Sequence, residues 1–116
     1  MSKILTLTGN PISTNHIYKH TGHRTYMTNE GKDIKEQYFY ELKNQWKRKP
    51  IKTEVALNII LFFGDKRKRD IDNYNKVVLD SLSGIVIEDD SQIQVLHLEK
   101  QYDKTNPRVE IEIYKI

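Results

Sequence analysis

Glu54-Val-Ala-Leu-Asn-Ile-Ile-Leu-Phe-Phe63 is the most apolar stretch of the chain. Its β-branched and aromatic side chains favour a strand, and a nearly continuous apolar run is typical of a strand buried inside a sheet. Gly64 ends the run. The sequence therefore predicts a central strand over residues 54–63, around which the other elements pack.

Two segments that flank this strand carry helical patterns. The first begins with Thr28 as its cap, has apolar and aromatic residues at helical spacing, and runs to about Arg48, just before a Lys-Pro pair. The second opens with Asp70 and Asp72, continues with apolar residues at helical spacing, and ends before Gly84. We predict one helix on each side of the central strand in the sequence.

The remaining segments have shorter patterns. Residues 3–8 alternate as a half-buried strand, and residues 9–31 are polar and rich in turn formers, which predicts a long loop. Two more strands are expected at about 93–101 and 108–114, joined by residues 103–107 as a hairpin loop. The order β-α-β-α-β-β predicts an α+β (α/β) fold, a small mixed β-sheet of about four strands with two helices packed against it.

The composition limits the class of protein. The 116 residues suffice for one domain but not for two independent cores, so we expect a single domain over residues 1–116. No run approaches the roughly 18 apolar residues of a membrane span. The first residues alternate like a strand and do not resemble a signal peptide. The absence of cysteine excludes disulfides and cysteine-based zinc sites, and we expect a cytoplasmic protein.

Charge is unevenly distributed along the chain. The formal net charge of +3 is a weak signal, but basic residues crowd into residues 43–52 and into Lys66-Arg67-Lys68-Arg69. Acidic residues follow the second run at once and recur at Glu88-Asp89-Asp90. A polyanionic partner such as DNA would explain the basic runs. It would not explain the adjacent carboxylates, which repel phosphates unless a cation lies between them.

Asp70 and Asp72 are two residues apart. At the end of an extended strand this spacing points both carboxylates to one side, where they can share a hard cation. Lys76 follows Asp72 by one helical turn and could neutralise a phosphate oxygen or a leaving group, while Asn73 could donate to phosphate. The alternative is that the aspartates only cap the helix.

The acidic group Glu88-Asp89-Asp90 also has two interpretations. It could form a turn between two elements, because aspartate is a common turn residue. Three consecutive acids repel one another, however, and one of them could fold back to complete a metal site with Asp70 and Asp72. Three carboxylates from two distant parts of a chain commonly hold Mg²⁺ and leave positions for water and phosphate.

The polar segment before the first helix has two further possibilities. The spacing of its three histidines, His16, His20 and His23, could suggest a zinc site, but no fourth ligand is in view. Contact with DNA phosphates is the favoured interpretation for Lys19, His20 and Arg24.

Arg69-Asp-Ile-Asp-Asn-Tyr-Asn-Lys-Val-Val-Leu-Asp80, followed by Ile87-Glu-Asp-Asp-Ser-Gln92, resembles the RusA family of Holliday-junction resolvases. That family's signature is a basic run, Asp-x-Asp-Asn-x-x-Lys, a helix ending near an Asp, and Asp-Asp-x-Gln. Pro11-x-Ser13-x-Asn15 and the Glu30-Gly31 helix entry also match, so the resemblance extends over about residues 4–114.

The resemblance implies an Mg²⁺-dependent crossover junction endodeoxyribonuclease of DNA recombination and repair, a homodimer that nicks two opposed strands of a four-way junction. It implies that Asp70, Asp72 and Asp90 are the catalytic carboxylates that hold the metal and that Lys76 is the catalytic lysine. Contacts with the DNA are expected from Lys66, Arg67, Lys68, Arg69 and Asn73. Two alternatives stay open: a DNA-binding module without cleavage, and a nuclease for other branched DNA such as forks or flaps.

Overall fold

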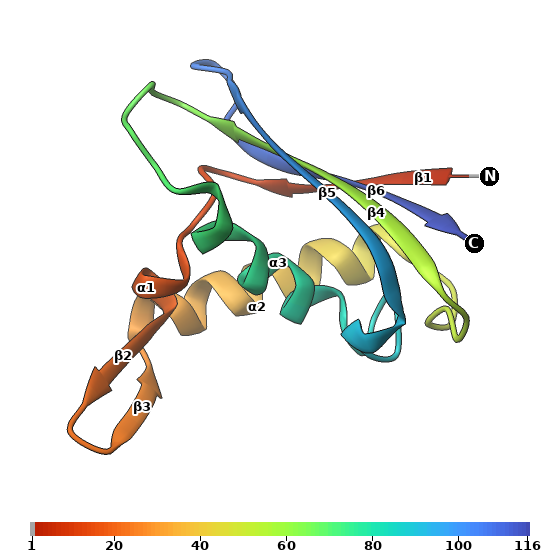
Figure 1. The fold of residues 1–116 in the computed structure, drawn as a ribbon, viewed down its shortest axis with the longest axis horizontal. Helices are drawn as coiled ribbons and strands as arrows, with labels where there is room; N and C mark the ends of the chain where they lie inside the picture. Colours follow the sequence, from red (N-terminus) through yellow and green to blue (C-terminus); the bar gives the residue numbers. More distant parts are fainter. Residues whose placement is uncertain (1) are drawn as a thin grey trace.

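A computed structural model describes residues 2–116 and shows a mixed four-stranded sheet with helices on one face (Figure 1). The elements are β1 (Ser2–Thr8), α1 (Thr14–Ile17), β2 (Tyr18–Thr21), β3 (Arg24–Met27), α2 (Asn29–Gln45), β4 (Val55–Phe63), the 3₁₀ helix η1 (Ile71–Tyr74), α3 (Asn75–Leu82), the 3₁₀ helix η2 (Asp90–Gln92), β5 (Ile93–Tyr102) and β6 (Arg108–Lys115). The sheet order is β1-β6-β4-β5, with β4 parallel to β5 and antiparallel to β6. The predicted α+β fold with a mixed sheet of four strands is confirmed.

β4 is the central strand that its sequence predicted. It lies between β5 and β6, and every second residue from Val55 to Phe63 is buried. These side chains face the helices, where Tyr38 and Leu42 of α2 are also buried. The intervening side chains of β4 are only half-buried, because in Figure 1 the helices cover a single face of the sheet.

α2 begins where the sequence placed it, since Thr28 Oγ1 accepts a hydrogen bond from the Gly31 N–H at 2.9 Å. It ends at Gln45, three residues earlier than the predicted Arg48. Trp46 takes an extended backbone conformation and buries its ring, and the Trp46 indole N–H donates to the carbonyl oxygen of Lys49 at 3.2 Å. None of the helices within residues 2–116 has the length and apolar character needed to cross a membrane.

The prediction of a continuous loop over residues 9–31 is wrong. The segment contains α1 and a second, two-stranded sheet in which β2 pairs with β3 in antiparallel register. Gly22 supplies the positive φ (58°) of the tight turn, and the Thr28 N–H closes the base of the hairpin by donating to the Ile17 carbonyl at 2.8 Å. Four-residue polar strands have no apolar alternation, so the sequence pattern could not reveal them. The hairpin projects from the body of the molecule (Figure 1).

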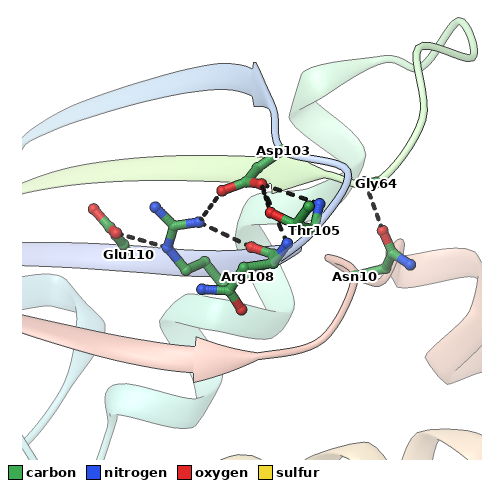
Figure 2. Close-up of polar contacts among 7 residues, drawn as sticks. Asn10, Gly64, Asp103, Thr105, Arg108 and Glu110 are labelled. Atoms are coloured by element: carbon green, nitrogen blue, oxygen red, sulfur yellow. Dashed lines mark hydrogen bonds and ion pairs between the residues drawn. The ribbon is translucent and has the colours of Figure 1, made fainter.

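Residues 103–107 do not form the predicted hairpin loop. β5 and β6 lie on opposite sides of β4, so this segment crosses the end of β4. Asp103 holds the crossing: the Asp103 N–H donates to the Phe63 carbonyl at 2.8 Å, and the Asp103 carboxylate pairs with Arg108 at 2.8 Å (Figure 2). The sequence marked a turn correctly, but a turn does not show whether the strands it joins are neighbours.

The exit of the chain from β4 is fixed at the same end of the sheet. The Gly64 N–H donates to Asn10 Oδ1 at 2.9 Å (Figure 2). A Cβ on Gly64 would lie 3.0 Å from Pro107 Cγ. This close approach favours glycine at position 64. The basic run 66–69 and the two aspartates that follow it therefore leave the sheet from a defined position.

Candidate functional site

The loop between β4 and η1 is ordered by Asp65. Its carboxylate accepts the backbone N–H of Arg67 at 3.0 Å and pairs with the Arg69 guanidinium at 2.8 Å. The Arg67 N–H bond and the contact with Arg69 lower the pKa of Asp65 to about 2. Arg69 also lies over the Phe63 ring, 4.3 Å from its centroid. The position of the Arg69 guanidinium is therefore fixed. In the sequence, the feature that indicates this ion pair is Asp65, an acidic residue four positions before Arg69.

Asp70 and Asp72 directly follow the basic run 66–69 in the chain. Asp70 has an extended backbone conformation, and Asp72 lies in the first turn of η1. Both side chains are exposed, and neither carboxylate has a hydrogen-bond or ion-pair partner within residues 2–116. Asp70 occupies the N-cap position without making a side-chain cap, so the capping alternative does not describe its carboxylate.

Lys76 lies on the first turn of α3, and its Nζ is 3.4 Å from an Asp80 carboxylate oxygen, one turn further along the helix. The Lys76 side chain is 60% exposed and that of Asp80 only 23%. The less exposed Asp80 carboxylate thus forms an ion pair with the more exposed Lys76 ammonium group. The i,i+4 spacing of these two residues was the sequence signal for this pair.

In the Asp-Asp-x-Gln segment, the side chains of Asp89 and Gln92 form hydrogen bonds within the fold, whereas that of Asp90 is exposed. Asp89 caps η2 through a bond from the Ser91 N–H at 3.1 Å, and contacts with Ser91 lower the pKa of Asp89. Gln92 Oε1 accepts the backbone N–H groups of Glu88 and Asp89 at 2.8 and 2.9 Å. The Asp90 carboxylate is exposed and has no hydrogen-bond or ion-pair partner in the described part of the chain. Of the two adjacent aspartates, Asp90 is the one whose carboxylate is available to a ligand.

Within a single chain, Asp90 lies far from Asp70 and Asp72. Gln92 Nε2 donates to the carbonyls of Ile51 and Thr53, which places η2 beside the start of β4, whereas Asp70 follows its end. A nine-residue strand spans roughly 26 Å. In Figure 1, η1 and the turn at residues 90–92 lie at opposite ends of α3. Among residues 2–116 no three His, Cys, Asp or Glu side chains gather in a group that could hold a metal ion.

The β2–β3 hairpin carries cations and is joined to the segment that bears the aspartates. Lys19 and Arg24 are exposed cations on it, His20 is also exposed, and the sequence contains no Asp or Glu before Glu30. The helix at its base, α1, contacts η1, where Thr14 Oγ1 donates to the Asn73 carbonyl at 3.0 Å. The exposed cations of the hairpin therefore extend from the same end of the molecule as Asp70 and Asp72.

Comparison with known proteins identifies the family. The model of the family described as endodeoxyribonuclease RusA matches residues 8–114, and the chain belongs to this family. A crossover junction endodeoxyribonuclease RusA of Aquifex aeolicus (strain VF5) is 36% identical over 75 residues, which are 64% of this chain and 60% of that protein. The protein of the same name from Escherichia coli (strain K12) is 30% identical over 73 residues, or 63% and 61% of the two chains. The chain thus spans about three-fifths of the length of these relatives.

Proposed function

We propose that this protein is a structure-specific endonuclease that resolves four-way DNA junctions by nicking two opposed strands. Membership of the RusA family supports this class of activity, as do the names of the relatives, which are crossover junction endodeoxyribonucleases. The observation that carries the proposal is the pair of exposed carboxylates of Asp70 and Asp72, directly after a run of four cations. Within residues 2–116 no hydrogen bond or ion pair uses these carboxylates, and DNA would be repelled by them without a cation.

The donor chemistry fits Mg²⁺. Asp70, Asp72 and Asp90 offer only oxygen ligands, which a hard divalent cation prefers. Because one chain separates Asp90 from the other two by about the length of β4, we propose that Asp90 of a second copy completes each site. The active form would then be a homodimer with two equivalent metal sites, as the paired nicking of two strands requires.

The surrounding residues have separate roles in this proposal. The bound metal would supply a water of lowered pKa near the scissile phosphate. Lys76, held by Asp80, would neutralise charge that develops on the phosphate or on the departing oxygen. Asn73 would donate to a phosphate oxygen.

The cations would position the DNA. Lys66, Arg67, Lys68 and Arg69 would contact the backbone next to the cleaved bond, and Lys19, His20 and Arg24 would contact one arm of the junction from the hairpin. The net charge of +3 per chain doubles in a dimer, so binding would be strongly salt-dependent. An enzyme of this kind would act on cellular DNA in the cytoplasm.

A nicking assay tests the proposal. Synthetic four-way junctions and matched linear duplexes are incubated with Mg²⁺ or with EDTA, using the wild type and Asp72→Asn. We expect paired nicks on the junction alone, their loss with EDTA, and a rate lower by about 10²- to 10³-fold in the variant, with junction binding retained. Binding without cleavage under any divalent metal would instead show a DNA-binding module, and preferential cutting of forks or flaps would replace the junction as substrate.

A further inference from the structure

A cavity of about 370 Å³ borders the basic run 67–69, which leads directly into Asp70 and Asp72. Its walls come from the loop after β1, from His16, from Glu30 at the start of α2, from Asp65 and Arg67–Arg69, and from Tyr74. The Asp65 carboxylate in this wall is paired with the Arg69 guanidinium. Arg69 immediately precedes Asp70, and Thr14, beside the Ser13 wall, is bonded to Asn73. A ligand in this cavity would therefore lie close to the DNA phosphate that the metal at Asp70 and Asp72 would bind.

Two side chains of the lining, His16 and Arg69, are held in place by contacts within the chain. Ser13 is a buried polar residue, and its Oγ is 2.7 Å from His16 Nδ1, which orients the imidazole and leaves Nε2 for another partner. Arg69 is fixed by Asp65 and by the Phe63 ring. A site whose side chains are already ordered loses less entropy when it binds a ligand.

The groups that line the cavity match the parts of a nucleotide. Pro11, Ile12 and Tyr74 are the apolar residues of the lining, and the half-buried Tyr74 ring, in T-shaped contact with the Phe63 ring, is the aromatic group on which a base could stack. Arg67 and Lys68 supply positive charge for a phosphate. Glu30 is exposed and has no hydrogen-bond or ion-pair partner within the described residues, and its carboxylate is an acceptor suited to an exocyclic amino group. The volume falls in the range of pockets that take small ligands.

We infer that this cavity receives one unstacked nucleotide of the DNA strand next to the cleaved bond, and that Glu30 favours a base with an exocyclic amino group over thymine. This inference rests on the proposed function. Strands at a branch point are already partly unstacked, so the cost of moving one base into a pocket is lower there than inside a duplex. The cavity would thus add base selectivity to recognition of the branch.

Cleavage profiles test the inference. Junctions that carry each of the four bases at each position near the cut are nicked by the wild type, by Glu30→Gln and by Glu36→Gln, a control on an exposed residue of the same helix. We expect the wild type and the control to disfavour thymine at one position by about tenfold. Glu30→Gln should reduce this ratio to about twofold, because an amide can also donate to thymine, while junction affinity changes little. A flat wild-type profile, or the same profile in Glu30→Gln, would overturn the inference.

A second measurement does not depend on cleavage. Junctions with 2-aminopurine at the selected position are bound in Ca²⁺, and fluorescence reports unstacking of that base. We expect a severalfold increase on the junction and none on a linear duplex. A fluorescence increase without nicking in Mg²⁺ would support the nucleotide pocket and contradict the proposed nuclease function. Nicking without a fluorescence increase would support the nuclease function and contradict the nucleotide pocket.

Discussion

The side chain of Gln92 accepts the backbone N–H of Asp89 at 2.9 Å, while Asp89 in turn caps the turn that ends at Gln92. The two residues form a reciprocal capping box at η2. Their mutual bonding explains why the acidic segment can be rigid although its carboxylates repel. It also leaves Asp90, which lies between them, as an exposed carboxylate on a fixed turn.

Gln92→Ala should therefore destabilise the protein although Gln92 is only half-buried. The change removes two bonds accepted at Oε1 and two donated by Nε2 to Ile51 and Thr53. We expect a loss of about 2–3 kcal/mol in the free energy of unfolding, measured by urea denaturation. Gln94→Ala, an exposed change on the neighbouring strand, should cost less than about 0.5 kcal/mol. Equal effects of the two changes would contradict the structural role of Gln92.

Gly31→Ala tests the packing at the base of the hairpin. A Cβ at this position would lie 2.7 Å from the Ile17 carbonyl oxygen and 2.9 Å from Ile17 Cα, so α1 and α2 would have to separate. We expect a loss of about 1–3 kcal/mol in unfolding free energy. Lys32→Ala, one residue further along α2 on an exposed position, is the matched control. A neutral Gly31→Ala would show that the two helices are not packed this closely.

The acid stability of the protein should depend on Asp65. Its pKa of about 2 in the folded state lies below the value of about 3.9 in an unfolded chain. The unfolded state therefore binds more protons between these values, and the stability from this group is present above about pH 4 and lost as the pH falls toward 2. Urea unfolding between pH 2.5 and 6 should show a shallower acid slope for Asp65→Asn, with Asp33→Asn as an exposed control. The same slope in wild type and Asp65→Asn would contradict the assignment.

Asp80 should act through Lys76. Lys76→Ala is expected to slow nicking by about 10²-fold and Asp80→Asn by several-fold, because the lysine loses its partner but keeps its charge. The double variant should be no slower than Lys76→Ala alone, since the role of Asp80 depends on the lysine. Additive effects in single-turnover nicking would show that the two residues act independently.

The hairpin should contribute to DNA affinity but not to the chemical step. Lys19→Ala combined with Arg24→Ala removes two exposed cations. It should weaken junction binding and reduce the slope of log affinity against log salt by up to about 2. Single-turnover nicking at saturating enzyme should change little. The control pair is Lys104→Ala with Lys115→Ala, at exposed positions of the crossing loop and of β6. If the hairpin variant had the same salt slope as this control, the hairpin would not be part of the DNA interface.

The sequence was informative where a pattern repeats over many residues. β4 could be predicted because its residues form a nearly continuous apolar run rich in β-branched and aromatic side chains, and α2 because its apolar residues recur at helical spacing. Asp70, Asp72 and Lys76 could be singled out because carboxylates beside cations need an explanation. The β2–β3 hairpin was missed because its strands are short and polar. The placement of β5 and β6 on opposite sides of β4 is set by long-range pairing, to which a turn sequence is indifferent. For the same reason, the sequence could not show how far Asp90 lies from Asp70 in one chain.

Mixed dimers test the central claim most directly. Asp72→Asn and Asp90→Asn chains with different affinity tags are co-expressed, and the heterodimer is purified and tested on four-way junctions in Mg²⁺ beside both parental variants. If Asp90 of one copy completes the site of Asp70 and Asp72 in the other, the heterodimer contains one intact site of two. It should then nick one strand at about half the wild-type rate of first nicking, while each parent nicks at least about 10²-fold more slowly than the wild type. A heterodimer as inactive as its parents, under conditions where the wild type cuts, would contradict a metal site shared between two copies.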